Sequence, residues 1–437
     1  MATEAIATGY GPARPTLDTR IAEVGFVLVL LLIIVGLTPF DVRTPAALAA
    51  RDAATASGDA VRQIAFLGTF ALIVYGALRK RGVMAVTAIP PMIALLLGWC
   101  MLSSLWSGET DVVARRAVLC AIFVSSMLLS VDTLGASRTI VIWRYAIGAI
   151  ILGDIASSLL IHGAVHLPDD IESGLAGSWR GLHSHKNMAG SVAASAVIMF
   201  LYFAIETRKW PDILMCAASA VFLVMTRSKS SMGLLPVALL AGWLYRIAWR
   251  NTLDRTIAAV GATLLIGMFA VGVLLEWNTI ARYLEDPQNF TGRAEIWAAE
   301  VAYIQDHPLF GAGFGTFGNT GFRSPIYQYV GGGWVAHIGE GHSGYLEMFV
   351  TLGSIGFAIG MIALLIQPFL QFWKSDRTEN NVNGMMFSLF IFDVLHNFME
   401  SDFVQVTSAQ WGQMLMVIAL LNVSSREIRE RQRAALP

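Results

Sequence analysis

Charged residues are scarce in this sequence. Asp, Glu, Lys and Arg make up 14% of the 437 residues and hydrophobic residues 55%, whereas a soluble domain carries about 25% charged residues. Apolar runs at 256–275 and 346–366 are each long enough to cross a bilayer as a helix. The scarcity of charge excludes an ordinary soluble domain and predicts an all-α polytopic membrane protein.

Cysteine is scarce too. Cys100, Cys120 and Cys216 all fall within predicted membrane spans, so they cannot form a disulfide framework or a metal cage of familiar spacing.

The first 20 residues lack an A-x-A cleavage site directly after an apolar core, which predicts that the first helix is a retained anchor. A formal net charge of −1 argues against a nucleic-acid partner.

The apolar segments predict one integral membrane domain over 1–437 with about twelve spans. They lie near 21–40, 61–79, 84–105, 113–132, 139–161, 188–206, 211–226, 230–247, 256–276, 343–371, 383–400 and 403–423. Pro90 and Pro91 predict a kink in the third span. The bias of Lys and Arg places both termini in the cytoplasm and the long polar segment 277–341 outside it.

The segment 277–341 is far longer than the other connections and ends directly before His342. Long loops in compact proteins usually carry function. Arg293 lies in the first turn of a predicted helix, where the dipole disfavours a cation. A bound anion resolves that conflict, and an ion pair with Glu300 is the structural alternative. The glycine-rich run 311–318 follows no strand, so it predicts tight turns and a hinge, not dinucleotide binding.

Two further external segments carry cations. In 179–187, Arg180 and Lys186 suit a phosphate-bearing ligand, while His183 and His185 are better explained as structural residues than as metal ligands. In the turn 226–231, Arg227 and Lys229 fit a phosphate-binding role and a helix-anchoring role equally well.

Ionisable groups near the membrane boundary complete the candidate site. His342 is placed to act as a general base near neutral pH. His396 and Glu400 are four residues apart, which puts them on one face of a predicted helix, either as a packing pair or as the floor of an external site. Asp154 lies within a predicted span and has no obvious partner.

Three blocks of the sequence resemble the O-antigen ligase and polysaccharide polymerase superfamily (Wzy-C type), and within it the exopolysaccharide polymerases of the ExoQ type. The blocks are W-R-G-L-H-S-H-K-N (179–187), G-R-A-E-I-W and D-H-P-L-F-G-A-G-F-G-T-F within 292–317, and H-S-G-Y-L-E-M-F-V-T-L-G (342–353). The H-K-N sequence and Ser343, where ligases often carry Asn, favour the polymerase branch.

The resemblance implies a GT-C-like, metal-independent, inverting glycosyltransferase that needs no cofactor. Members transfer a glycan from undecaprenyl diphosphate to an acceptor hydroxyl at the periplasmic face of the bacterial inner membrane. By this likeness Arg180 and Arg293 bind the donor diphosphate, and His342 deprotonates the acceptor. Chain-length regulators and exporters are the partner proteins that it implies.

Three functions remain open from the sequence. A polymerase transfers the glycan to another lipid-linked repeat unit, and an O-antigen ligase transfers it to lipid A-core. The third function is transport of a lipid-linked oligosaccharide, which predicts paired halves with broken helices and charges at the midplane. The polar groups of this sequence gather on one side, which favours a transferase.

Overall fold

The computed structural model describes residues 17–40, 59–168, 170, 174–248, 253–254, 256–257, 260–261, 293–318, 320, 323–330, 341–375, 380–406 and 408–434. An isolated bridge between extended segments joins Val165 and Trp179. Six of the described helices are long and apolar enough to span a membrane, and three shorter apolar helices accompany them. The chain is an all-α polytopic membrane protein, as its composition predicts.

The helices follow the predicted spans. In chain order they are α2 (Leu17–Ile34), α4 (Ala60–Arg81), α5 (Pro91–Leu102), α6 (Thr110–Leu134), α7 (Ala136–Leu160), α8 (Lys186–Thr207), α9 (Trp210–Thr226), α10 (Lys229–Ala248), α13 (Arg293–Asp306), α14 (Gly344–Met361), α15 (Gln367–Lys374), α16 (Asn380–His396) and α17 (Ala409–Ala434). A π-helical turn, Ile362–Ile366, joins α14 to α15. The predicted span at 256–276 lies mostly outside the described residues.

The third predicted span is broken where a kink was expected. A 3-10 helix, Gly82–Ala88, continues α4, and α5 begins only at Pro91. Proline lacks a backbone N–H and restricts the residue before it, so a Pro-Pro pair favours the start of a helix over its interior. The prolines therefore begin a new helix instead of bending one.

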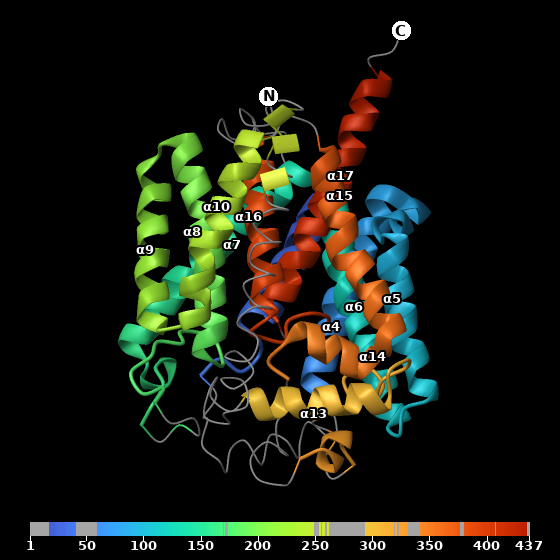
Figure 1. Cartoon of the computed structure of the whole chain (residues 1–437). Coiled ribbons are helices and arrows are strands. Elements are labelled where there is room, and N and C mark those ends of the chain that lie inside the picture. The colour runs from blue at the N-terminus through green and yellow to red at the C-terminus, as the bar shows by residue number, and fades with distance from the viewer. Residues whose placement is uncertain are drawn as a thin grey trace.

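The bundle has two polar ends. At one end, here called the loop end, α8 and α14 begin and α16 ends, and α13 lies crosswise beneath the bundle (Figure 1). At the other end, here called the arginine end, Asp132 at the end of α6 accepts hydrogen bonds from Arg81 of α4 and Arg426 of α17. Because Arg79 also pairs with Asp18, α2 begins at the arginine end, where α17 ends.

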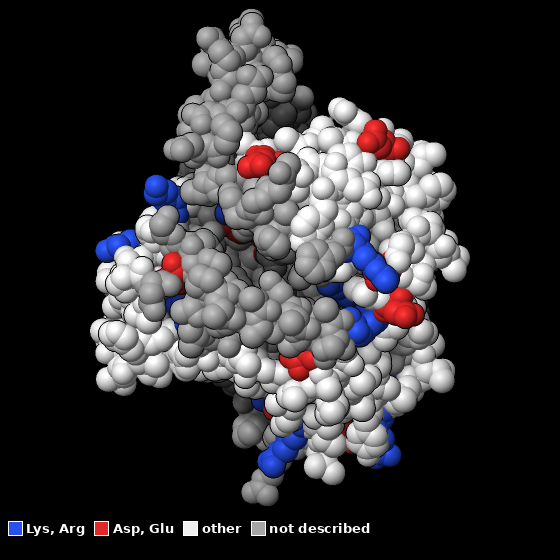
Figure 2. Space-filling view, turned by 90° about the horizontal axis from the view of Figure 1, so that it is seen from below, with Lys and Arg blue, Asp and Glu red and all other residues white. Residues whose placement is uncertain are grey.

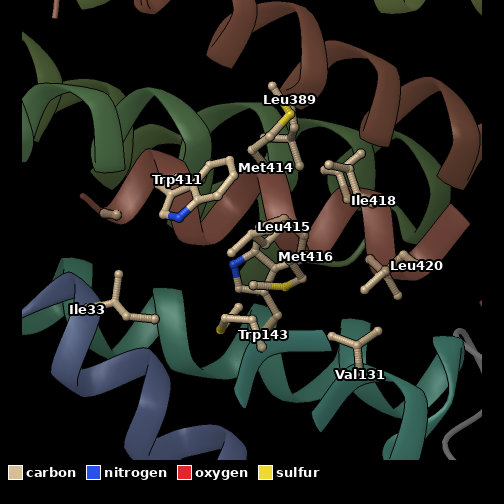
Figure 3. Packing of buried hydrophobic residues seen from close by; sticks show 14 of the residues in the cluster. Ile33, Val131, Trp143, Leu389, Trp411, Met414, Leu415, Met416, Ile418 and Leu420 are labelled. Carbon is tan, nitrogen blue, oxygen red and sulfur yellow. The ribbon is translucent and has the colours of Figure 1, made fainter. Parts of the chain in front are cut away.

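Helix α17 forms the centre of the core. Its residues from Ala409 to Leu421 are buried on all sides, and they pack against Ile33, Trp143 and Leu389 of three neighbouring helices (Figure 3). A helix surrounded by protein can hold polar residues when each finds a partner. Gln410 donates to Ser195 Oγ at 3.0 Å and Gln413 to Asp393 Oδ1 at 2.8 Å.

The glycine-rich run 311–318 is fixed against α14. Ala312 and Gly313 donate backbone hydrogen bonds to the carbonyls of Val350 and Thr351, each at 2.9 Å. Gly353 breaks the helix there with φ 68°, and a Cβ at this position would lie 2.1 Å from the Leu309 carbonyl oxygen. Positive φ values at Gly311, Gly313 and Gly315 confirm the predicted tight turns. The run thus anchors the long loop to the helix that begins beside His342.

Candidate active site

Glu400 lies at the centre of a polar cluster at the loop end. Its Oε1 accepts hydrogen bonds from Arg293 Nη2 and Asn187 Nδ2, both at 2.8 Å. Its Oε2 faces His342 Nδ1 at 3.3 Å. The side chains of Glu400 and Arg293 are each 15% exposed, whereas that of His342 is 33% exposed. Four segments that are distant in sequence therefore meet at one carboxylate, and the imidazole is more exposed than that carboxylate or the guanidinium of Arg293.

The helix predicted to carry Glu400 ends earlier than expected. α16 stops at His396, and Asn397 Oδ1 then accepts hydrogen bonds from the backbone of Asp402 and Phe403 at 3.1 and 2.9 Å. The prediction that His396 and Glu400 share a helix face is therefore wrong. His396 instead pairs with Asp402 at 2.6 Å, and the turn after α16 directs Glu400 toward His342.

This turn also organises the start of α14. The first N–H groups of a helix lack partners within it. Ser343 N–H donates to Ser401 Oγ at 3.1 Å, and Gly344 N–H donates to the Asn397 and Glu400 carbonyls at 2.8 and 3.0 Å. Directly before them His342 takes the left-handed region, with φ 52°. The hydrogen bonds of Ser343 and Gly344 therefore fix the backbone that directly follows His342.

Electrostatics favour the ionised form of Glu400. Burial alone raises the pKa of Glu400, but the hydrogen bond from His342 and the charges of Arg293, His342 and His396 outweigh it and lower the pKa below its usual range. An ionised carboxylate only accepts hydrogen bonds, so His342 Nδ1 carries the proton that faces it. In the neutral imidazole, Nε2 is then a proton acceptor. This is the arrangement of a general base oriented by a carboxylate.

Arg293 is held by the turn after α16. Its Nη1 donates to the Met399 carbonyl and its Nη2 to Glu400. A carboxylate of the same chain thus lies beside this cation in the first turn of α13, and the bound anion expected there stays a prediction. The alternative partner, Glu300, makes no hydrogen bond with it among the described residues. Arg293 therefore links α13 to the segment that carries Glu400.

Two carboxyl groups flank the peptide just before His342. Gly341 N–H donates to Glu347 Oε2 at 3.1 Å, and its carbonyl accepts from Trp297 Nε1 at 3.0 Å. Glu300 is 0% exposed, and neither of its oxygens has a hydrogen-bond partner among the described residues. Burial, with the nearby charge of Glu347, raises the pKa of Glu300 well above its ordinary value. The neutral acid is therefore the form that this packing favours.

The 179–187 segment reaches the site through its last residue. Asn187 binds Glu400, whereas Arg180 is 4% exposed and donates to the carbonyls of Gly163 and Ser184 at 2.9 and 3.1 Å. Arg180 thus holds its own loop in shape. Asn187 was not predicted as a site residue, because its contact with Glu400 spans 213 positions and no spacing rule reveals it.

The histidines of this segment are structural, as predicted. His183 Nε2 pairs with Asp154 Oδ2 at 3.2 Å and Nδ1 with the Ile34 carbonyl at 2.9 Å. Burial lowers the pKa of His183, but the charge and hydrogen bond of Asp154 outweigh it and raise the pKa. His185 caps α8 by accepting from Asn187 N–H at 3.1 Å. Asp154, for which the sequence indicated no partner, is therefore paired with His183.

The remaining predicted cations lie at the same end of the bundle. Lys186 Nζ is 3.4 Å from the Arg227 carbonyl, and Arg227 Nη1 is 3.3 Å from the Ala176 carbonyl. Lys229 is exposed at the start of α10. On this face, seen from below, blue Lys and Arg groups occur at several places with red acidic groups among them (Figure 2).

Of the other two histidines of the long loop, His307 does not join the cluster: its ring packs against Tyr303 with centroids 4.6 Å apart. His337 lies outside the described residues. Among the described residues, no group of three or more His, Cys, Asp or Glu is arranged to hold a metal ion. Metal-independent transfer stays a prediction.

A comparison with protein families finds a family model that matches part of the chain. Residues 214–361 match the model of the Wzy_C family, described as O-antigen ligase. The matched stretch includes Arg227, Lys229, Arg293 and His342. A search of curated proteins finds no match. The match supports the O-antigen ligase and polymerase superfamily, and the ExoQ type within it stays a prediction.

Proposed function

We propose, from the O-antigen ligase family match and the cluster around Glu400, that this chain is a polysaccharide polymerase. In this proposal it transfers a glycan from undecaprenyl diphosphate to a hydroxyl of another lipid-linked repeat unit at the periplasmic face of the inner membrane. The observation that carries the proposal is the 3.3 Å contact between His342 Nδ1 and Glu400 Oε2, a carboxyl group whose pKa its partners lower. A sugar hydroxyl is a poor nucleophile, and an oriented imidazole supplies the base that it lacks.

The transfer is a single displacement. The acceptor oxygen attacks the anomeric carbon while its proton passes to His342 Nε2. The bond between that carbon and the diphosphate oxygen breaks, and its electron pair leaves with the diphosphate. A glycosidic bond of inverted configuration forms. Glu400 keeps its negative charge throughout and stabilises the imidazolium through Nδ1–H.

The leaving diphosphate needs positive charge beside it. Arg293 has further N–H groups besides those that bind Met399 and Glu400. We assign it to the diphosphate, together with Lys186, Arg227 and Lys229 from the same end of the bundle. Arg180 contributes by positioning, since its guanidinium donates to two carbonyls of the loop that carries Lys186.

An O-antigen ligase is the second candidate, because the matched family model carries that description. The two candidates share the donor and the chemistry and differ in the acceptor. Purified protein supplied with lipid-linked repeats alone distinguishes them. Chain growth without lipid A-core supports the polymerase, whereas product that forms only when lipid A-core is added supports the ligase.

The site assignment is tested with variants of the full chain in membranes. We expect His342→Ala and Arg293→Ala to lose high-molecular-weight polymer relative to the amount of protein, which is measured for each variant because Arg293→Ala also removes a partner of Glu400. Two matched controls lie outside the cluster: His307→Ala in the same loop, and Arg323→Ala, whose side chain is 82% exposed. Full activity in both site variants would contradict the assignment of His342 and Arg293 to the active site.

A further inference from the structure

Asn187 belongs to the cluster around Glu400 but has no part in the steps proposed for transfer. Its Nδ2 donates to Glu400 Oε1 at 2.8 Å, and Arg293 Nη2 donates to the same oxygen at 2.8 Å. The other oxygen, Oε2, faces His342 Nδ1 at 3.3 Å. One oxygen of the carboxylate thus faces the proposed base, while two donors from different segments hold the other oxygen.

The start of α8 is capped by another side chain. His185 is the N-cap of this helix, and its Nδ1 accepts a hydrogen bond from the Asn187 backbone N–H at 3.1 Å. An N-cap side chain satisfies one of the N–H groups that the first turn leaves without a partner. The Asn187 amide is therefore left to bind Glu400, which lies 213 positions away in the sequence.

Asn187 lies in the first turn of a helix that is held firmly in the core. Every residue of α8 from 189 to 200 is buried. A Cβ on Gly190 would lie 2.4 Å from Ser228 Cβ, so the backbone of α8 lies directly against the residue that precedes α10. Interiors packed this closely leave little room for movement. The Asn187 amide therefore donates to Glu400 from a fixed position.

The two donors to Glu400 Oε1 differ in charge. Arg293 is a cation, and the proposed function assigns its further N–H groups to the leaving diphosphate. A guanidinium that is shared between two anions holds each of them less tightly than it would hold one alone. The amide of Asn187 is neutral. It orients Glu400 without cancelling the negative charge that stabilises the imidazolium.

We propose that Asn187 is a positioning residue for transfer, which keeps Glu400 directed at His342 while Arg293 faces the diphosphate. This inference rests on the proposed function. Asn187 acts through Glu400, and its replacement leaves in place the cations that are assigned to the donor. The proposal therefore predicts a change in kcat at nearly constant KM, as for an interaction that matters only in the transition state.

The test is steady-state transfer by the purified full chain in proteoliposomes, with a lipid-linked oligosaccharide diphosphate as substrate. Asn187→Leu keeps the approximate size of the side chain and removes the donor. We expect kcat to fall about tenfold, as for one hydrogen bond to a charged group, and KM to change by less than about twofold. Asn187→Ala adds no bulk and should lower kcat by at least about threefold, which keeps the proposal testable if the leucine variant does not fold.

The matched control is Asn422→Leu, the same substitution in α17 at the arginine end. The Asn422 amide also takes part in a 2.8 Å hydrogen bond, which it accepts from Gln371 Nε2. We expect this variant to keep kcat within about twofold of wild type. An equal fall in both leucine variants would overturn the proposal, since the loss of any such bond would then slow transfer. Unchanged kcat in Asn187→Leu, or a change confined to KM, would also overturn it.

A double-mutant cycle separates action through Glu400 from an independent role of Asn187. Once Glu400→Gln has removed the carboxylate charge, adding Asn187→Leu should lower kcat by less than about twofold. A further tenfold fall would contradict action through Glu400. Wild-type transfer by Glu400→Gln alone would contradict the proposed site itself. Slow transfer by Glu400→Gln together with wild-type transfer by Asn187→Leu would overturn only the role of Asn187.

Discussion

Glu400 is the residue on which the site depends. It accepts hydrogen bonds from Arg293 and Asn187 and faces His342, so three segments are tied to one carboxylate. Removing one member of a buried ion pair strongly destabilises a protein, because the charge of the other member is left without a partner. The same residue therefore supports both the local structure and the orientation of the proposed base.

Glu400→Gln tests both roles. The amide keeps the size of the side chain but removes the charge, so we expect a fall in kcat of about 10²-fold or more with little change in the KM for the donor. We also expect a loss of about 3 kcal/mol in unfolding free energy at neutral pH.

The pH dependence of that loss follows from the lowered pKa of Glu400. The stabilisation is fully present above the ordinary carboxyl pKa of about 4.3 and is lost as the pH falls toward the lower folded-state value. Unfolding measured across this range should show the difference between wild type and Glu400→Gln shrinking in acid. A difference that stays constant down to strongly acidic pH would contradict the assignment of an ionised Glu400.

Glu300 gives the opposite sign, because its pKa is raised by burial and by Glu347. The penalty for ionising it is absent below about pH 4.3 and grows as the pH rises to its folded-state pKa. We expect Glu300→Gln to raise the unfolding free energy by about 1–3 kcal/mol at alkaline pH and by much less in acid. The exposed Glu295→Gln on the same helix should change it by less than about 0.5 kcal/mol.

At the scale of the element, α14 is the helix that links the site to the rest of the fold. Its first N–H groups bind the turn after α16, and its break at Gly353 receives the glycine-rich run of the long loop. The backbone of Ser354 completes this contact by donating to the Pro308 carbonyl at 2.8 Å. The helix therefore fixes His342 and the glycine-rich run 311–318 relative to each other.

Gly353→Ala is expected to disrupt that junction. The new Cβ would meet the Leu309 carbonyl oxygen at 2.1 Å, and φ 68° strains any L side chain. We expect lower thermal stability and faster proteolysis of the long loop. Gly98→Ala in α5 is the matched control, since nothing lies within 4 Å of its Cβ. Alanine there should be neutral or stabilising by up to about 1 kcal/mol. Equal stability of the two variants would contradict the junction.

The sequence predicted most of these elements, because long apolar runs in a membrane protein leave few alternatives to a helix. The prediction was wrong at the start of one helix and at the end of another. The Pro90–Pro91 pair begins α5 where a bend was expected, and the side chain of Asn397 donates to the Asp393 carbonyl in the last turn of α16, which ends before Glu400. Both failures are local hydrogen-bonding effects that hydropathy does not register.

The site was predicted in part. His342, Arg293 and Glu400 were singled out by their position at a membrane boundary, and the structure brings them together. Asn187 was missed, and Arg180 is engaged with carbonyls of its own loop. Composition and spacing reveal which side chains are unusual in a membrane protein. They do not reveal which of them meet across more than two hundred residues.

At the scale of the whole molecule, the two ends of the bundle differ in chemistry. The loop end carries the cluster around Glu400, and the arginine end carries the shared pairs of Asp132. The excess of Lys and Arg on cytoplasmic loops predicts that the loop end faces the periplasm.

Single cysteines test this orientation in a background without native cysteines. Lys229 and Lys209 are exposed and lie at opposite ends of the bundle, since α10 begins at the loop end and α9 begins at the arginine end. We expect a membrane-impermeant maleimide to label Lys229→Cys in intact spheroplasts and Lys209→Cys only after permeabilisation. Labelling in the reverse order would contradict the orientation.

The most direct measurement is transfer by the purified protein in proteoliposomes with a lipid-linked oligosaccharide diphosphate as the only glycan. The account predicts that wild type and His307→Ala lengthen the glycan and release one lipid diphosphate for each bond formed. It predicts that His342→Ala binds the donor with unchanged affinity and falls about 10²–10⁴-fold in rate. Elongation by His342→Ala at the wild-type rate would contradict the central claim that His342, oriented by Glu400, is the base.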